Sequence, residues 1–394
     1  MAARTDLAGR LSTLTAINAV SHGVRPILSY KVLDLGGGAL QIGFMTGSYA
    51  VLPFLAAVPI GALIDRHGPR RFMIGGAVLA LVASLLSLAA TGFLVLYLSQ
   101  ALLGLGHISV ALAAQAYAAR SESATGRVKG FAHLAVSTSL GQFLGPLIAG
   151  AMVPTGSTDP LRTSLALIVT SAIAATAVLL SVSGPRDGAR EADHDEETLN
   201  LSKVRDLVRM PGMMSALSAG VMVLTMIDVL VAYMPLIGET RGIAPATIGM
   251  LLSLRAAAAI VSRLALPIIA RSRDHRTVLR DSLALAGFGF VVMSMAPNEW
   301  SLGLGLAIIG FSLGMGTPLT GSWIAGSVAP NLRGTVLSVR MASNRFSQIL
   351  IPPVLGFVVV TFGVGSLVTV SAAALVATAA GVERTRRAGL LETD

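Results

Sequence analysis

The chain has 394 residues, of which 54% are hydrophobic and only 12% are charged, and its mean hydropathy is +0.75. Soluble domains carry roughly a quarter charged residues, so this composition excludes an ordinary soluble protein and predicts an all-α membrane protein. The net charge of +9 does not indicate nucleic-acid binding, because the basic residues form short clusters between apolar runs. Cys is absent, which excludes disulfides, thiolate metal sites and a Cys nucleophile.

Twelve apolar runs are long enough to cross a bilayer, which takes about 20 residues. The first six are residues 11–33, 40–63, 72–90, 93–119, 130–153 and 161–182. The last six are residues 213–238, 245–270, 278–296, 299–325, 335–361 and 364–382. We therefore predict two six-helix bundles, 1–182 and 213–394.

A polar stretch, 183–212, separates the two bundles; it opens acidic and closes basic. Leu201, Val204, Leu207 and Val208 recur in it at helical spacing. This pattern suits either a short helix on the membrane surface or a disordered linker.

The positive charges indicate how the chain crosses the membrane. If the N-terminus is inside, 21 of the 29 Lys and Arg residues fall in cytoplasmic segments, six lie within spans, and only Arg162 and Arg241 fall in outer loops. Cytoplasmic loops carry the excess of Lys and Arg in membrane proteins. This bias predicts that the N-terminus and the C-terminus are both cytoplasmic. We expect a multi-pass monomer in the cytoplasmic (inner) membrane.

The two halves repeat one another. A shift of 206 residues aligns 127–150 with 333–356 and gives six identical positions, among them Gln142 with Gln348 and Pro146 with Pro352. A shift of 205 places the loop that ends at Arg71 on the loop that ends at Arg276. Such parallel repeats are typical of one class of transporter, in which the substrate site lies near the bilayer midplane.

The loop between the second and third spans carries the most specific motif. Its characteristic residues are Gly61, Asp65, Arg66, Gly68, Arg70 and Arg71. The segment resembles the signature loop of the major facilitator superfamily, Gly-x-Leu-x-Asp-Arg-x-Gly-x-Arg-Arg. The resemblance implies a conformational latch, in which Gly61 admits a neighbouring helix, Gly68 permits the turn, and Asp65 pairs with Arg or caps a helix. The corresponding loop of the second half is degenerate, with Ala270 at the Asp position and Arg273 at the Gly position.

Two further segments resemble motifs of the same family. In the fifth span, Gly141, Gly145, Pro146 and Gly150 match the antiporter signature Gly-x-x-x-Gly-Pro-x-x-Gly-Gly, with Ala149 replacing one Gly. These residues allow close helix packing and a bend at the proline, and a generic packing face is the alternative. In the fourth span, Gln100, Gly104 and Gly106 match a motif whose first residue is usually Arg, so the proton-coupling role of that Arg does not transfer to Gln100.

Ionisable groups inside the spans are the candidate functional residues, because charge at bilayer depth is costly unless it is paired or hydrated. The substrate-binding candidates are Arg25, Arg255, Arg345, His22 and the neighbouring Gln348. The proton-coupling candidates are Asp228, the only acidic residue deep within a span, and His107. For Arg263, Arg340 and Lys31 we expect structural contacts, such as bonds to helix carbonyls.

The resemblance implies a secondary active transporter that works by alternating access, and the antiporter motif favours proton-coupled efflux. The spans hold six Lys and Arg against one clear carboxylate, which favours an anionic or zwitterionic organic solute. The alternatives are carboxylate uptake or uniport, efflux of a lipophilic cation, and a non-transporting sensor of the same fold. No catalytic constellation indicates an enzyme, and no cofactor or metal is predicted. The expected partners are the solute, protons and lipid, and not nucleic acid.

Overall fold

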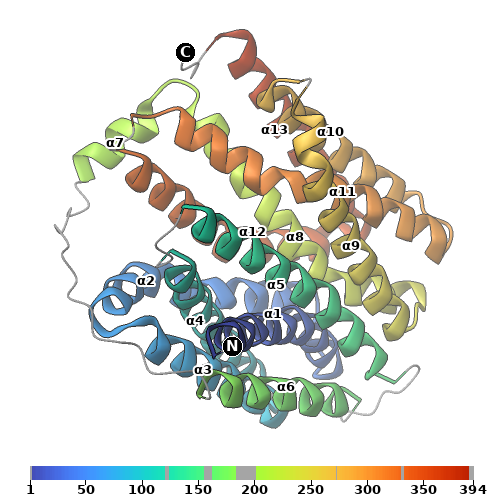
Figure 1. Cartoon of the computed structure of the whole chain (residues 1–394). Helices are drawn as coiled ribbons and strands as arrows, with labels where there is room; N and C mark the ends of the chain where they lie inside the picture. Colours follow the sequence, from blue (N-terminus) through green and yellow to red (C-terminus); the bar gives the residue numbers. More distant parts are fainter. Residues whose placement is uncertain are drawn as a thin grey trace. The chain divides into compact units, whose positions relative to one another are not determined.

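The computed structural model describes residues 2–119, 124–154, 162–182, 201–271, 273–329 and 332–389, and these residues form helices and short connections without a strand (Figure 1). The first half contains α1 (Ala2–Asp34), α2 (Ala39–His67), α3 (Pro69–Ala89), α4 (Phe93–Ala119), α5 (Ala124–Ala151) and α6 (Ser164–Val182). The second half contains α8 (Met213–Arg241), α9 (Pro245–Ile269), α10 (His275–Ser294), α11 (Glu299–Gly326), α12 (Arg333–Phe362) and α13 (Gly365–Arg387). Each of the twelve predicted spans coincides with one of these helices, which confirms the all-α prediction.

Eleven of these helices are long and apolar enough to cross a membrane. The twelfth long helix is α1, which holds His22, Arg25 and Lys31. The short α7 (Leu201–Arg209) is a helix within the predicted linker, with Leu207 buried and Arg205 exposed. The acidic part of that linker, 183–200, lies outside the described residues.

The chain divides into two compact units. The first comprises Met1–His194 and Val231–Ser253, and the second comprises Asp195–Leu230 and Leu254–Asp394. The segment Val231–Ser253 joins the first unit through side-chain bonds to backbone carbonyls of that unit. Tyr233 donates to the Ala39 carbonyl (3.0 Å), and Ser253 donates to the Phe143 carbonyl (2.7 Å). The units therefore differ at this segment from the sequence-based division at residues 182 and 213.

The helix boundaries repeat at the predicted spacing. Helices α2, α3 and α4 begin at residues 39, 69 and 93, and α9, α10 and α11 begin at residues 245, 275 and 299. Each pair of starting points is separated by 206 residues, the shift that the sequence predicts from α5 and α12. The repeat is therefore confirmed and extends over most of each half.

Small residues set the helix packing within each unit. A Cβ at Gly104 of α4 would collide with the Tyr49 carbonyl of α2, and a Cβ at Gly106 would lie 2.6 Å from the Gly76 carbonyl oxygen of α3. These glycines belong to the predicted fourth-span motif, and they let α4 pack against α2 and α3 at backbone distance. The close packing of α4 on α2 positions the side chains of the site.

Candidate functional site

The second unit contains a polar cluster on α8 and α12. Gln348 donates a short hydrogen bond to the Asp228 carboxylate and accepts one from Arg345 at 3.0 Å. Asp228 and Gln348 are each 8% exposed, while Arg345 is half-buried. Ser347, next to Gln348, also bonds to Thr225 of α8 at 3.2 Å. The cluster links a guanidinium to a carboxylate through one amide.

Arg255 of α9 is the most deeply buried cation of the second unit, with 2% of its surface exposed. Among the described residues, its Nε and Nη2 atoms have no hydrogen-bond partner. These two N–H groups lie along one edge of the guanidinium, and this edge binds a carboxylate in bidentate fashion. Asp228 attracts this guanidinium electrostatically and Arg263 repels it. Arg255 therefore offers a preformed anion-binding edge near the Asp228 cluster.

Three other intramembrane cations have the structural contacts that the sequence predicts. Arg263 donates to the Gly314 carbonyl of α11 (3.3 Å), and Arg340 donates to the Thr317 carbonyl and the Thr320 hydroxyl (both 3.1 Å). Lys31 donates to the Ser87 and Leu88 carbonyls at the end of α3, each at 2.8 Å. The backbone contacts confirm the expected type of role for these residues.

The first unit contains a second polar cluster, in which α1, α2 and α4 meet. The Tyr49 hydroxyl bonds to His107 Nδ1, and His107 Nε2 lies 3.3 Å from Asn18 Oδ1. The Arg25 guanidinium lies over the Tyr49 ring, 3.7 Å from its centroid. His22 bonds to the Asn18 carbonyl (3.0 Å), and its ring meets the His107 ring edge-on at 6.3 Å. The structure thus brings together three predicted residues: His22, Arg25 and His107.

Sequence reasoning missed Tyr49 and Asn18, because an isolated Tyr or Asn in an apolar run carries no charge signal. The repeat could have identified Tyr49. At a shift of 206 residues, Tyr49 corresponds to Arg255, and Gly104, which packs on the Tyr49 carbonyl, corresponds to Gly310, which packs on the Arg255 carbonyl. The same shift pairs His22 with Asp228. Two positions of the repeat therefore carry a polar or aromatic residue of the cluster in each unit.

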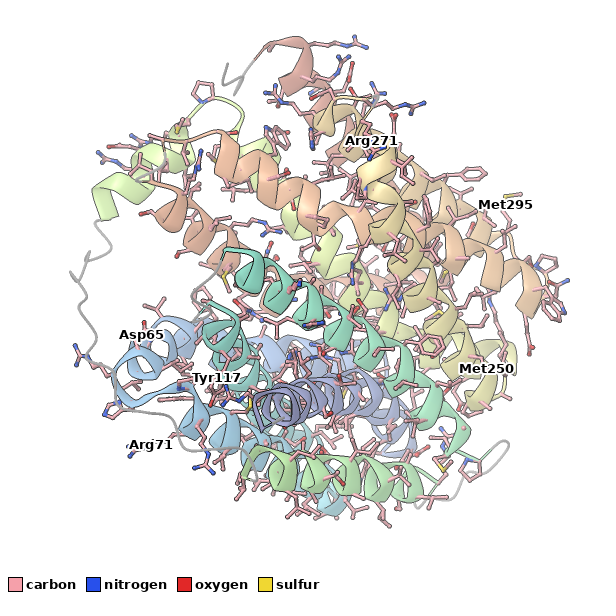
Figure 2. All side chains as sticks on the ribbon, viewed as in Figure 1. Asp65, Arg71, Tyr117, Met250, Arg271 and Met295 are labelled. Atoms are coloured by element: carbon pink, nitrogen blue, oxygen red, sulfur yellow. The ribbon has the colours of Figure 1, made fainter. Side chains whose placement is uncertain are left out.

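The predicted latch loop forms the turn between α2 and α3, where Asp65 and Arg71 are labelled in Figure 2. Gly68 has φ +82°, a conformation that favours glycine, and Pro69 begins α3. Arg70 donates to the Val182 carbonyl at the end of α6 (2.6 Å), where a cation is favourable. Arg66 and Arg71 are exposed. The loop therefore ties α3 to α6.

One detail of the latch prediction is wrong in this structure, and one of the two alternatives for Asp65 is excluded. A Cβ at Gly61 would meet no atom within 4 Å among the described residues, so no neighbouring helix uses this glycine for a close approach. The N-cap of α3 is Gly68, and Asp65 lies in the last turn of α2, so Asp65 does not cap α3. Asp65 is exposed, which leaves it accessible for a charge pair.

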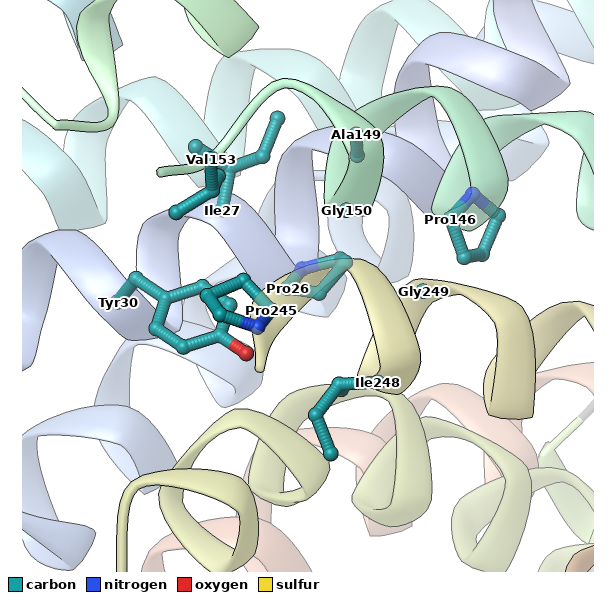
Figure 3. Close-up of a pocket in the computed structure, with 10 residues that line it drawn as sticks. All are labelled: Pro26, Ile27, Tyr30, Pro146, Ala149, Gly150, Val153, Pro245, Ile248 and Gly249. Carbon is teal, nitrogen blue, oxygen red and sulfur yellow. The ribbon is translucent and has the colours of Figure 1, made fainter. Parts of the chain in front are cut away.

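The fifth-span motif is a packing surface on α5. Cβ atoms at Gly141 and Gly145 would collide with the backbone or side chains of α1, at Asn18 and Ala19 respectively. A Cβ at Gly150 would lie 2.7 Å from the Gly249 Cα of α9. Pro146 lies inside α5, as predicted. Figure 3 shows the small apolar pocket beside this crossing, lined by Tyr30, Pro146, Gly150 and Gly249 among others.

An ion cluster lies at the end of the first unit opposite to the latch loop. Arg162 contacts Asp34 of α1 at 2.7 Å and Glu239 of α8 at 2.8 Å. The side chains of Arg162 and Asp34 are 8% and 6% exposed, whereas Glu239 is 39% exposed. Ser29 of α1 also donates to the Ala232 carbonyl of α8 (2.7 Å). This end of α8 is therefore held against α1.

The described part of the chain offers no evident metal site. Within the described residues, no three His, Asp or Glu side chains form a cluster that could hold a metal ion. The two polar clusters offer instead buried cations, the Asp228 carboxylate and two imidazoles, which can bind organic anions and exchange protons. Together with the helical repeat, these features define a polytopic membrane carrier.

Comparison with known proteins agrees with this class. The sequence model of the Major Facilitator Superfamily matches residues 11–352, and the chain belongs to this family. It is a multi-pass membrane transporter and not an enzyme, as the sequence predicts.

Solved structures with the same fold include several transporters. The nucleoside transporter NupG is 15% identical, with a TM-score of 0.80 over 97% of this chain and 99% of that chain. The D-xylose-proton symporter is 13% identical, with a TM-score of 0.75 over 96% of each chain. A bacterial homologue of the human lysosomal transporter Spinster, inward-facing and occupied, is 14% identical, with a TM-score of 0.72 over 96% of each chain. These identities establish the shared fold alone.

Proposed function

We propose that this protein is a secondary active transporter that exports a small anionic or zwitterionic organic solute in exchange for protons. It works as a monomer in the cytoplasmic (inner) membrane, with both termini in the cytoplasm. The charge bias of the loops supports this orientation, and the fifth-span motif supports antiport.

The observation that carries the proposal is the unsatisfied edge of Arg255. A buried N–H group without an acceptor costs about 1–3 kcal/mol, and Arg255 has two of them on one edge. A substrate carboxylate, sulfonate or phosphate that accepts both bonds removes this cost. A lipophilic cation would add a further positive charge beside a buried guanidinium. The site therefore supports an anionic group on the substrate better than a cationic one.

Asp228 is the proposed proton carrier. Its carboxylate is buried and attracts the Arg255 guanidinium. A zwitterionic solute can place its carboxylate on Arg255 and its ammonium group on the ionised Asp228 carboxylate. Protonation of Asp228 removes the partner of the ammonium group, so a proton and the solute compete for Asp228, and proton binding on one side of the membrane favours release of the solute there.

Alternating access would use two contacts of the first unit. The latch loop ties α3 to α6 through Arg70, and the opposite end of the unit holds α8 and α9 through Arg162 and the Gly150–Gly249 approach. Opening of the predicted outer side requires the Arg162–Glu239 and Gly150–Gly249 contacts to separate. His22, Arg25 and Gln348 complete the proposed substrate contacts, and His107 is a second proton-coupling candidate.

A stabilisation screen with matched ligands tests this proposal. The compounds 3-phenylpropionate, phenylalanine and phenethylamine share one skeleton and present an anion, a zwitterion and a cation, and they seed a library built on the same three headgroups. We expect anions or zwitterions to raise the melting temperature, and Arg255→Lys to lose that shift because Lys lacks the bidentate edge. Arg263→Lys is the matched control, since Arg263 is held by a backbone carbonyl.

The outcomes separate the alternatives. Stabilisation by cations alone, retained in Arg255→Lys, would favour efflux of lipophilic cations. Ligand binding without flux in sealed vesicles would identify a sensor. Flux of an anion that is independent of a pH gradient would indicate uniport, and inward accumulation driven by protons would indicate uptake.

A further inference from the structure

The hydrogen bonds around His107 have a fixed direction. The Asn18 amide nitrogen donates to the Leu14 carbonyl (2.9 Å), so the Asn18 side-chain oxygen faces His107. That oxygen accepts only, and His107 must therefore carry a proton on Nε2. In the neutral ring Nδ1 is then an acceptor, and the Tyr49 hydroxyl donates to it. The side-chain carbonyl of Asn18 thus sets the tautomer of His107 and the orientation of the Tyr49 hydroxyl.

The Tyr49 side chain is fixed from both ends. Its hydroxyl is held by His107, and its backbone is held by the close approach of Gly104. Tyr49 is 2% exposed, so its ring has little room to move. The ring face carries the Arg25 guanidinium at 3.7 Å, and Arg25 is itself 4% exposed. A buried cation–π contact of this kind favours one position of the guanidinium.

The repeat supports a functional role for this position. Tyr49 corresponds to Arg255, and both backbones are packed against a glycine two helices further along the chain, Gly104 and Gly310 respectively. In the second unit this position supplies the guanidinium directly. In the first unit it supplies an aromatic face, and the guanidinium comes from Arg25 of α1. His107 meets two titratable groups from neighbouring helices, the Tyr49 hydroxyl and the His22 ring, and Arg25 lies beyond Tyr49 on the face of its ring.

We propose that Tyr49 is a positioning residue, anchored by His107, that holds Arg25 in place to bind the anionic group of the substrate. The inference rests on the proposed function insofar as Arg25 binds an anion. The contact of Tyr49 with Arg25 and the tautomer of His107 do not depend on any substrate. These two features can therefore be tested without a ligand.

The ligand-free test uses nitrogen NMR of the full chain. In protein with labelled His, the His107 signal is identified by its loss in His107→Gln, and we expect a neutral ring with the proton on Nε2. In protein with labelled Arg, the Nε signal of Arg25 is identified by its loss in Arg25→Lys. We expect Tyr49→Leu to move that signal towards the range of ordinary Arg residues. Tyr97→Leu, which changes a half-buried tyrosine on α4, is the matched control and should leave it in place.

The binding test uses 3-phenylpropionate and compares Tyr49→Phe with Tyr49→Leu. Phe keeps the ring and loses only the hydroxyl bond, so we expect affinity to fall about 3- to 10-fold. Leu loses the aromatic face as well, and we expect a fall of about 10- to 30-fold. Arg25→Ala should lose binding altogether, and Tyr97→Leu should bind as the wild type does.

Each outcome decides between the proposals. If Arg25→Ala lowers affinity but Tyr49→Leu does not, or if the Arg25 signal does not move in Tyr49→Leu, the positioning role of Tyr49 is wrong. A His107 ring found with its proton on Nδ1 overturns the anchor. If Arg25→Ala binds normally, or if the wild type binds no anion, the proposed function fails at this residue; the NMR result then still decides whether Tyr49 holds Arg25.

Discussion

The Arg162 ion cluster gives a prediction whose magnitude follows from burial. Arg162→Gln leaves the Asp34 carboxylate, only 6% exposed, without its cation at 2.7 Å. Removing one partner of a buried pair costs about 3–5 kcal/mol, because the remaining charge stays desolvated. Lys31, which lies one turn earlier on α1, is already held by the Ser87 and Leu88 carbonyls. We therefore expect Arg162→Gln to lower the free energy of unfolding by about 3 kcal/mol or more.

Two substitutions of the carboxylates provide the internal comparison. Glu239 is 39% exposed, so Glu239→Gln should cost about 1 kcal/mol or less, as surface ion pairs do. The loss in free energy of unfolding for Asp34→Asn should fall between those for Arg162→Gln and Glu239→Gln, because Arg162 keeps Glu239 as a partner. The assay is reversible unfolding of the purified protein in mixed micelles, followed by circular dichroism. Equal and small losses for Arg162→Gln and Glu239→Gln would refute the reasoning, since burial would then not govern the cost.

Four further predictions concern transport. Asp65→Asn should keep folding and surface expression but slow transport by removing a charge pairing in the latch; a normal rate in vesicles would exclude this role. Asp228→Asn should abolish flux driven by a pH gradient and keep exchange down a substrate gradient, and unchanged coupling would move the proton site to His22 or His107. Arg345→Lys should weaken substrate binding about 10-fold and Arg345→Ala should nearly eliminate it, as checked by calorimetry, because Lys lacks the planar fork; binding that survives Arg345→Ala would contradict a substrate contact. Gly249→Ala places a Cβ 2.5 Å from the Pro146 carbonyl oxygen, so α5 and α9 should separate here and a single Cys introduced at Ile248 should react faster with a thiol reagent. The chain has no native Cys that would also react. Labelling equal to that of the Ile248→Cys protein alone would show that the two helices keep their contact.

The helices were predictable because their signal is long and redundant. A run of about 20 apolar residues specifies a membrane helix almost regardless of its neighbours. The repeat followed from identities in α5 and α12 and extends to α2, α3 and α4, whose sequences show little of it. The predicted motif glycines at 104, 141, 145 and 150 do pack against other helices. Gly61 meets no other described residue at its Cβ position, because a motif gives the residue type but not the contacts that the residue makes.

The polar clusters were only partly predictable. Arg25, Arg255, Asp228 and His107 could be recognised because charge or imidazole within an apolar run is unusual. Tyr49 could not be recognised from its residue type, because an aromatic residue in such a run is ordinary; its register with Arg255 in the repeat was the one signal that the sequence offered. The Arg162 cluster was also out of reach, because its partners are far apart in the sequence.

The central claim is that an anionic or zwitterionic organic solute and a proton are exchanged across the membrane by this chain. The most direct test is purified protein in sealed vesicles that contain a pH-sensitive dye, with a solute identified in the stabilisation screen loaded on one side. We predict that the solute gradient drives proton movement in the opposite direction and that an imposed pH gradient accumulates the solute, both only in vesicles with active protein. Solute flux with no change in internal pH, or no flux of a compound that binds, would contradict the claim.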